Sequence, residues 1–191
     1  MKKLNTLIIG SGASGLAAAL HLDSLGVKNI AIYTEGLKMG TSINPGSDKQ
    51  TYYKLGMYAL EADSPVMMAK DLSSGGSMHG DIALIESALS VPGFFTLTHL
   101  GVPFPHDEFG QYIGYKTDHD PKRRATSCGP YTSKEMCLAL ISEIKHRNIP
   151  VTEKRIAVKL LTDSKKERSA GAIFINRENG EFEVVQAENI I

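Results

Sequence analysis

Residues 7–15 read Leu-Ile-Ile-Gly-Ser-Gly-Ala-Ser-Gly, and this stretch decides the fold. Its first three residues form an apolar run that is typical of a buried parallel strand. Gly10, Gly12 and Gly15 have the spacing G-x-G-x-x-G, and strongly helix-forming sequence follows over residues 16–22. The pattern therefore predicts a strand, a tight turn and a helix in direct succession.

Each glycine has its own physical role in such a turn. Gly10 permits the sharp change of direction, Gly12 lets a diphosphate approach the backbone, and Gly15 lets the helix pack closely on the strand. The free N–H groups and the positive dipole end of the helix then face the phosphates. The sequence at this turn therefore predicts a diphosphate site.

A second apolar run covers residues 30–33, and Glu35 follows it, twenty positions after Gly15. Its carboxylate can accept hydrogen bonds from the 2′-OH and 3′-OH of a ribose, and it would repel a 2′-phosphate. Strand, glycines, helix, second strand and acid in this register predict a dinucleotide site. The alternative is a Gly-rich turn in another α/β protein, and the motif does not distinguish NAD from FAD.

The segment after Glu35, residues 36–47, is small, polar and rich in turn-forming residues, which predicts a loop. It lies beyond the carboxyl end of the second strand, where α/β sheets bind ligands, so its polar side chains can contact phosphate or the flavin edge. A plain solvated loop is the alternative. The candidate cofactor-binding residues are Gly10, Ser11, Gly12, Ala13, Ser14, Gly15, Glu35, Gly40, Thr41, Ser42, Asn44 and Gly46.

Composition limits the remaining choices. The 191 residues suit a single α/β domain, residues 1–191, and 21 basic residues balance 21 acidic ones. We therefore expect no nucleic-acid partner. Two cysteines without metal-type spacing predict no metal site and favour a reducing, cytoplasmic location. No apolar run of about eighteen residues is present, so we expect no membrane span.

Periodicity and breaker residues divide the rest of the chain. Residues 48–62 are expected to form a helix, Ser64-Pro65 to begin the next, and Pro92 to restart a third that starts at residue 82. Thr132 and Glu135 fit a capping box before a helix over residues 133–147. A short strand should begin at residues 149–151. Three antiparallel strands are expected over residues 155–162, 169–176 and 181–187, with an Asn179-Gly180 turn, and a further strand over residues 189–191.

Residues 106–131 give the least clear pattern, being rich in Gly, His, Asp, Lys and Arg. A metal site there is disfavoured because no recognised ligand spacing is present. Residues 122–124, Lys-Arg-Arg, either bind an anion or form a solvated basic turn.

The order of these motifs resembles the flavoprotein subunit family of fumarate reductase, succinate dehydrogenase and L-aspartate oxidase. The shared features are the Gly10–Gly15 fingerprint with Glu35, the loop over residues 40–46, the stretch from Asp71 to Leu84, the Leu-Gly-Val-Pro-Phe sequence at 100–104, the helix over 132–147 and a β-meander over 155–187. The likeness spans nearly the whole chain. It implies a Rossmann-like FAD-binding domain with a parallel sheet, a helical insertion and a three-stranded antiparallel β-meander that lies over the adenosine half of FAD.

The resemblance implies FAD as cofactor rather than NAD, and an FAD-dependent oxidoreductase that transfers hydride through flavin N5. It implies a small-molecule substrate, a dicarboxylate or an enoate-like acid, and it is compatible with an electron-transfer partner. The usual Ala-x-Gly-Gly of the flavin loop is absent, because Asn44-Pro45-Gly46-Ser47 stands there. No histidine in this loop suggests a covalent flavin link.

The family continues from a strand like Ile190-Ile191 into a substrate-capping domain, where its substrate-binding and proton-donating residues lie. The resemblance therefore implies that this chain is the N-terminal part of a longer flavoprotein, and no catalytic residue can be assigned within it. A buried strand is also a poor place for a natural C-terminus. The alternatives are a non-catalytic dinucleotide-binding or interaction module, and an NAD-dependent dehydrogenase, for which no catalytic His/Asp or Tyr/Lys pair is recognisable.

Overall fold

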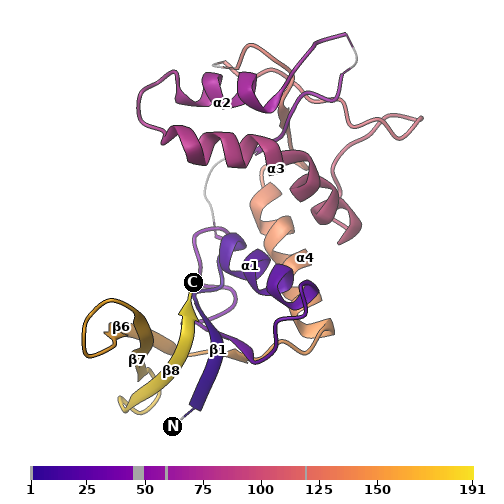
Figure 1. Ribbon diagram of the computed structural model, residues 1–191. Helices are drawn as coiled ribbons and strands as arrows, with labels where there is room; N and C mark the ends of the chain where they lie inside the picture. The colour runs from indigo at the N-terminus through magenta and orange to yellow at the C-terminus, as the bar shows by residue number, and fades with distance from the viewer. Residues whose placement is uncertain (1, 45–49, 59, 119) are drawn as a thin grey trace. The chain divides into compact units, whose positions relative to one another are not determined.

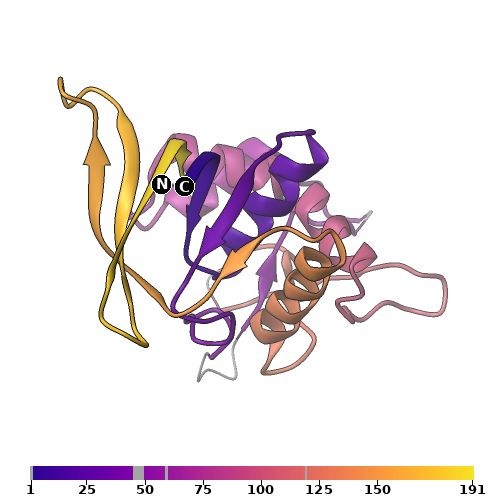
Figure 2. The same cartoon turned by 90° about the horizontal axis from the view of Figure 1, so that it is seen from below.

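The computed structural model describes residues 2–44, 50–58, 60–118 and 120–191. The chain divides into two compact units, one of residues 1–45 with 136–191 and the other of residues 46–135. Each unit is described by itself below, and Figures 1 and 2 show the ribbon from two directions.

The first unit is built on a six-stranded sheet with the strand order β5-β2-β1-β8-β7-β6. Strands β5, β2, β1 and β8 pair in parallel with one another, and β8 also pairs antiparallel with β7, which pairs antiparallel with β6. Figure 2 shows the meander, in orange and yellow, turning away from the parallel strands. The strands are β1 (Lys2–Ile9), β2 (Ile30–Tyr33), β5 (Val151–Thr152), β6 (Arg155–Thr162), β7 (Ser169–Asn176) and β8 (Phe182–Ile190).

Buried apolar side chains of the sheet explain why these segments pair. Leu7 of β1, Tyr33 of β2, Phe174 of β7 and Val185 of β8 are all nearly inaccessible to solvent and belong to one cluster. The rings of Tyr33 and Phe174 pack against each other with their centroids 4.8 Å apart and their planes tilted by 37°. Apolar burial of this kind supplies the main driving force for folding, and here it joins the parallel strands to the meander in one core.

The predicted order strand, turn, helix, strand is confirmed at the N-terminus. Helix α1 (Ala13–Ser24) follows β1 directly and ends before Gly26, whose φ of +81° suits only glycine well. The Asn179-Gly180 turn is also confirmed, since it connects β7 with β8 and Gly180 has a φ of +74°. The α/β class and the Rossmann-like arrangement with a meander are therefore confirmed.

One strand is longer than expected. Residues 182–190 form a single strand, β8, that pairs antiparallel with β7 and parallel with β1, as Figure 1 shows for β1 and β8. The expectation of separate strands over 181–187 and 189–191 was wrong. Val185 and Ala187 are the alternate buried residues of this strand. Its parallel pairing with β1 continues past them to Asn189 and Ile190, so the strand is not interrupted.

The second unit contains helices α2 (Pro65–Ser73) and α3 (Gly80–His99) and a two-stranded sheet of β3 (Tyr52–Tyr53) and β4 (Ala125–Thr126). The predicted start of α2 is confirmed, because the hydroxyl of Ser64 accepts a hydrogen bond from the N–H of Met67. The expected helix over 48–62 was wrong in its described part, where Tyr52 and Tyr53 form β3 instead. Pairing with β4, more than seventy positions away, overrides the local helical preference.

Two helix boundaries also differ from expectation. Pro92 lies inside α3 and does not restart it. Helix α4 (Thr132–His146) lacks the predicted capping box, because the Thr132 hydroxyl accepts from Cys128 N–H and donates to the Gly129 carbonyl. Thr132 therefore fixes the preceding turn rather than the helix end.

Helix α3 is the one helix in the described residues that is long and apolar enough to cross a membrane, by length and composition alone. An 18-residue window of it has a mean hydropathy of 1.2. Its buried residues include Ala83, Phe94 and Leu97. Core helices pass the same test, so this is weak evidence, and the absence of a membrane span stays a prediction.

Candidate dinucleotide-binding site

The turn between β1 and α1 uses its three glycines in three different ways. Gly10 has a φ of +102°, a conformation that side chains strongly disfavour, and its N–H donates to the Tyr33 carbonyl at 2.8 Å. A Cβ on Gly15 would lie 2.6 Å from the Gly10 carbonyl oxygen, so glycine is required there by close packing. Gly12 has an ordinary φ of −69° and precedes the first helical residue. Backbone conformation therefore does not require glycine at position 12, and its role is to leave the space above the backbone free of a side chain.

A closed ring of hydrogen bonds joins this turn to the end of β2. The buried hydroxyls of Ser11 and Thr34 lie 2.9 Å apart. Ser11 Oγ also donates to the Gly36 carbonyl at 3.1 Å, and the Gly36 N–H donates to Thr34 Oγ1 at 3.3 Å. Because Ser11 has one hydroxyl proton, Thr34 is the donor in the bond between them. The ring holds the glycine turn and the Glu35 segment in fixed register.

The loop after Glu35 folds back over the turn. Ser42 Oγ accepts from the Ala13 N–H at 3.3 Å and lies 3.4 Å from where a Cβ on Gly12 would be. Gly40 passes close to the Gly12 backbone, because a Cβ on Gly40 would lie 3.8 Å from the Cα of Gly12. Asn44 donates to the Lys38 carbonyl at 2.7 Å and to the Gly40 carbonyl at 3.1 Å. The amide of Asn44 thus shapes the loop itself.

A cavity of about 540 Å³ opens at this place, which is within the range of about 300–1,000 Å³ for ligand pockets. The fingerprint, the end of β2, the following loop and the start of β6 all contribute to its wall. Its lining residues are Ile9, Gly10, Ser11, Gly12, Tyr33, Thr34, Glu35, Gly36, Met39, Gly40, Thr41, Ser42, Arg155, Ile156 and Ala157.

The structure brings seven of the twelve sequence-predicted site residues to this wall: Gly10, Ser11, Gly12, Glu35, Gly40, Thr41 and Ser42. Ala13, Ser14 and Gly15 form the first turn of α1, whose N–H groups lack partners inside the helix. Asn44 is exposed and is not among the lining residues. Gly46 lies outside the described residues.

A family model described as an FAD binding domain matches residues 5–191. The chain belongs to the FAD-binding domain family. FAD is accordingly the cofactor of this domain, which the glycine fingerprint alone left undecided between NAD and FAD.

The known proteins that this chain matches are longer than the chain. L-aspartate oxidase of Pseudomonas aeruginosa is 28% identical over 201 residues, which cover 96% of this chain and 35% of that protein. The structure of Mycobacterium smegmatis Sdh1 in complex with UQ1 matches with a TM-score of 0.83 at 18% identity, covering 100% of this chain and 34% of that one. E. coli quinol fumarate reductase FrdA matches with a TM-score of 0.80 at 16% identity, covering 100% and 32%. The chain thus spans about a third of these proteins.

The residues present fit FAD. A free space stands above Gly12, since a Cβ there would meet only Ser42 Oγ within 4 Å. Glu35 lines the same cavity, so an acidic acceptor and a helix N-terminus lie in one wall, as the adenosine diphosphate half of the cofactor requires. The groups that line the cavity are therefore those that a bound FAD needs.

Eight residues of this wall were not among the sequence candidates, and three of them, Tyr33, Thr34 and Arg155, have polar side chains that make hydrogen bonds. Thr34 closes the hydrogen-bonded ring with Ser11 and Gly36. Its position directly after a buried strand was the sequence feature that could have identified it. Arg155 lines the cavity, and its Nε donates to Glu183 at 2.7 Å. Tyr33 also donates to Glu183, at 3.2 Å, and burial together with this carboxylate raises the pKa of Tyr33. Only pairing across strands reveals these contacts.

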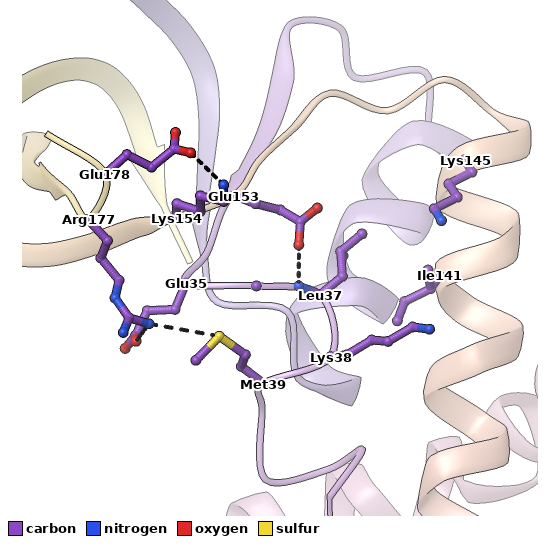
Figure 3. A pocket seen from close by; sticks show the side chains of 11 residues that line it. Glu35, Leu37, Lys38, Met39, Ile141, Lys145, Glu153, Lys154, Arg177 and Glu178 are labelled. Atoms are coloured by element: carbon purple, nitrogen blue, oxygen red, sulfur yellow. Dashed lines mark hydrogen bonds and ion pairs between the residues drawn. The ribbon is translucent and has the colours of Figure 1, made fainter.

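Beside Glu35 lies a second cavity of about 610 Å³, shown in Figure 3. Arg177, from the turn between β7 and β8, approaches Glu35 with its Nη1 3.2 Å from Oε2. Glu153 accepts the N–H of Leu37 at 2.9 Å and so holds the loop after Glu35. Arg177 was likewise missed, since no local pattern connects residues 35 and 177.

The basic turn at residues 122–124 serves structure in this FAD-binding domain. Arg124 is buried and makes charged hydrogen bonds to Asp63, Asp71 and Asp120. The Arg123 guanidinium lies 4.9 Å from the centre of the Tyr58 ring. The three carboxylates engage Arg124, which leaves it unsuited to bind an external anion. Across the part of the chain that is described, no group of three His, Cys, Asp or Glu residues is placed to hold a metal ion.

Proposed function

We propose that this chain is the FAD-binding part of an FAD-dependent oxidoreductase of the fumarate reductase, succinate dehydrogenase and L-aspartate oxidase type. The observation that carries the proposal is the cavity in which the glycine turn, the N-terminus of α1 and Glu35 meet. When bound, FAD supplies hydride transfer at its flavin ring. The residues of this chain bind and orient it.

The diphosphate is proposed to lie above Gly12, against the N–H groups of the first turn of α1. Gly10 and Gly15 act by shaping and packing that turn, and Ser11 fixes it to β2. Ser14 supplies a backbone N–H group at the positive end of the helix. The Ala13 N–H donates to Ser42 Oγ, so Ala13 is proposed to act by holding the loop over the turn. Glu35 is proposed to accept hydrogen bonds from the ribose hydroxyls.

The loop over residues 40–44 is proposed to cover the diphosphate and lead toward the flavin. Thr41 and Ser42 line the cavity with hydroxyls, and Gly40 allows the close approach of the loop to the turn. Asn44 acts indirectly, by holding the loop through its two bonds to backbone carbonyls. Gly46 remains a candidate from sequence.

The substrate is proposed to be a small dicarboxylate or a related acid. L-aspartate, named in the P. aeruginosa relative, is a dicarboxylate, and this supports the proposal. Redox partners would deliver or remove the electrons. The thiols of Cys128 and Cys137 are both free, which supports a reducing, cytoplasmic location.

Flavin reconstitution tests the proposal. The purified protein is incubated with excess FAD, freed of unbound cofactor and examined by absorbance and by flavin fluorescence. We expect bound FAD near one per chain and no comparable retention of NAD. Tight NAD binding with no retained flavin would overturn the assignment. Reduction of fumarate and related acids by reduced flavin, measured on the intact protein, then tests the activity separately.

A further inference from the structure

We propose that Arg177 is a positioning residue for Glu35, and that it thereby sets how strongly the site distinguishes a ribose from a 2′-deoxyribose. The inference rests on the proposed function, because it assigns a role to a contact of the proposed ribose acceptor. The contact itself is the approach of Arg177 Nη1 to Glu35 Oε2 at 3.2 Å (Figure 3).

The backbone places Arg177 independently of this ion pair. The Lys154 N–H donates to the Glu35 carbonyl at 3.1 Å, and the Arg177 N–H donates to the Lys154 carbonyl at 3.0 Å. Lys154 has a φ of +61°, an uncommon conformation for a residue with a side chain, and lies between β5 and β6. Backbone hydrogen bonds thus connect residues 35, 154 and 177, which are far apart in sequence. These bonds place the Arg177 side chain near Glu35 without help from the ion pair.

The ion pair leaves one carboxylate oxygen for a ligand. Arg177 donates to Oε2 of Glu35, and in the residues that the structure describes no side chain donates to Oε1. Glu35 lines both the cavity at the glycine turn and the second cavity beside it, whereas Arg177 lines only the second cavity. Arg177 therefore reaches the carboxylate from the second cavity, and in the described residues Oε1 has no side-chain donor and can accept from a ligand.

The nitrogen of Arg177 that bonds to Glu35 also contacts Met39. Its Nη1 lies 3.9 Å from the Sδ of Met39, a residue whose side chain borders both cavities (Figure 3). Because both partners of the ion pair are about half exposed, at 46% for Arg177 and 48% for Glu35, the pair itself adds little to folding stability. Its effect is expected in ligand selection, since a fixed carboxylate loses less conformational freedom when a hydroxyl binds.

The test compares ADP with 2′-deoxy-ADP as probes of the adenosine half, by calorimetry on the flavin-free protein. We expect the unaltered protein to prefer ADP by about tenfold, the low end for a hydrogen bond to a charged group. Glu35→Gln should reduce this ratio to about twofold, the remainder of a neutral bond. Arg177→Met should reduce the ratio substantially, and Arg177→Lys should restore part of it.

A double-variant cycle separates positioning from a direct contact. If Arg177 acts through Glu35, then Arg177→Met should have no further effect on the ratio once Glu35→Gln is present. Glu181→Gln serves as control, because Glu181 lies in the same turn, accepts from Asn179 at 2.7 Å and lines neither cavity. It should keep the full ratio.

Two results would overturn the proposal. One is an unchanged ratio in Arg177→Met, whether or not both ligands bind more weakly. The other is an additive effect in the double variant, which would mean that Arg177 meets the ligand directly. Failure of the unaltered protein to retain FAD or to bind ADP would instead overturn the proposed function, so the two failures are distinguishable.

Discussion

The Oγ of Ser11 lies 2.9 Å from the Oγ1 of Thr34, and both hydroxyls are buried. Ser11 belongs to the glycine turn and Thr34 to the segment that leads into Glu35, so this one bond joins the two halves of the nucleotide site. With the bonds through Gly36 it forms a ring in which each donor has an acceptor. Fully satisfied buried networks of this kind rigidify their surroundings.

Ser11→Ala should therefore affect both stability and binding. The change leaves the Thr34 hydroxyl and the Gly36 carbonyl without their partner, which is expected to cost about 1–3 kcal/mol of unfolding free energy. Urea titration measures this loss, and flavin fluorescence should show weaker FAD binding because Glu35 and the turn are no longer held together. Thr34→Ser, which keeps the hydroxyl, is the control and should behave nearly as the unaltered protein. A Ser11→Ala protein with normal stability and normal FAD affinity would contradict the role given to the ring.

Gly12 and Gly15 should respond to substitution in opposite ways. Gly12→Asp puts a favoured N-cap residue at an ordinary φ of −69°, so stability should be unchanged or higher. The new carboxylate occupies and repels the diphosphate position, and FAD affinity should fall more than tenfold, equivalent to about 1.4 kcal/mol.

Gly15→Ala should instead destabilise the protein by about 1–3 kcal/mol, as overpacking does. Its Cβ would lie 2.6 Å from the backbone oxygen of Gly10, which cannot move aside without shifting the turn. Thermal unfolding and flavin titration of the two variants side by side check the contrast. Equal effects on both properties in both variants would count against the separate roles of the glycines.

Arg124 should be among the residues most costly to replace. Its guanidinium binds Asp63 in bidentate fashion, at 2.8 Å to each oxygen, and reaches Asp71 at 2.7 Å. Arg124→Met leaves these carboxylates without their cation, which is expected to cost about 3–5 kcal/mol. Arg123→Met, at a partly exposed neighbour, should cost less than about 1 kcal/mol. Chemical denaturation of both variants measures the difference, and similar losses would mean that the buried cluster contributes little.

Asp63 predicts how stability depends on acid pH. Burial by itself raises the pKa of Asp63, but hydrogen bonds from Arg124 and from the N–H groups of Gly56 and Ser64 outweigh it, so the net pKa is lowered. A group with a lowered folded-state pKa contributes stability above its unfolded value, about 3.9, and loses it as pH falls through the folded value. The free energy of unfolding should therefore decline below about pH 4, and Asp63→Asn should show a shallower decline. An identical acid slope in the variant would exclude Asp63 as a cause.

Lys54 should make stability depend on pH in the alkaline range. Its side chain is fully buried, with Nζ 5.1 Å from the centre of the Phe94 ring and 3.4 Å from the Tyr112 carbonyl. Burial lowers the pKa of Lys54, so the unfolded state holds the proton more tightly. Stability should fall as pH drops from the unfolded pKa, about 10.4, toward the folded one.

Lys54→Met keeps the length of the chain and removes the poorly satisfied ammonium. Below the folded-state pKa of Lys54, it should raise the unfolding free energy by about 1–3 kcal/mol and remove this part of the pH dependence. Urea titrations between neutral and alkaline pH measure both effects. A loss of stability at neutral pH would show that the ammonium has a favourable role in the fold.

Local sequence predicted the parts whose contacts are local. The β1–turn–α1 unit, the cap at Ser64 and the Asn179-Gly180 turn each depend on residues within a few positions of one another. The errors arose where distant pairing prevails. Residues 52–53 form a strand because β4 pairs with them, and Thr132 is drawn away from capping by the Cys128 turn.

The sequence by itself determined the nucleotide turn, because the spacing of Gly10, Gly12 and Gly15 and the acid at Glu35 encode their geometry through short-range sterics and helix electrostatics. Only the tertiary structure decided what surrounds it. The Ser11–Thr34 bond, the place of Arg155 and the pairing of Arg177 with Glu35 arise from strands brought together by the burial of their apolar faces. Such packing follows from the whole sheet, and no spacing along the chain expresses it.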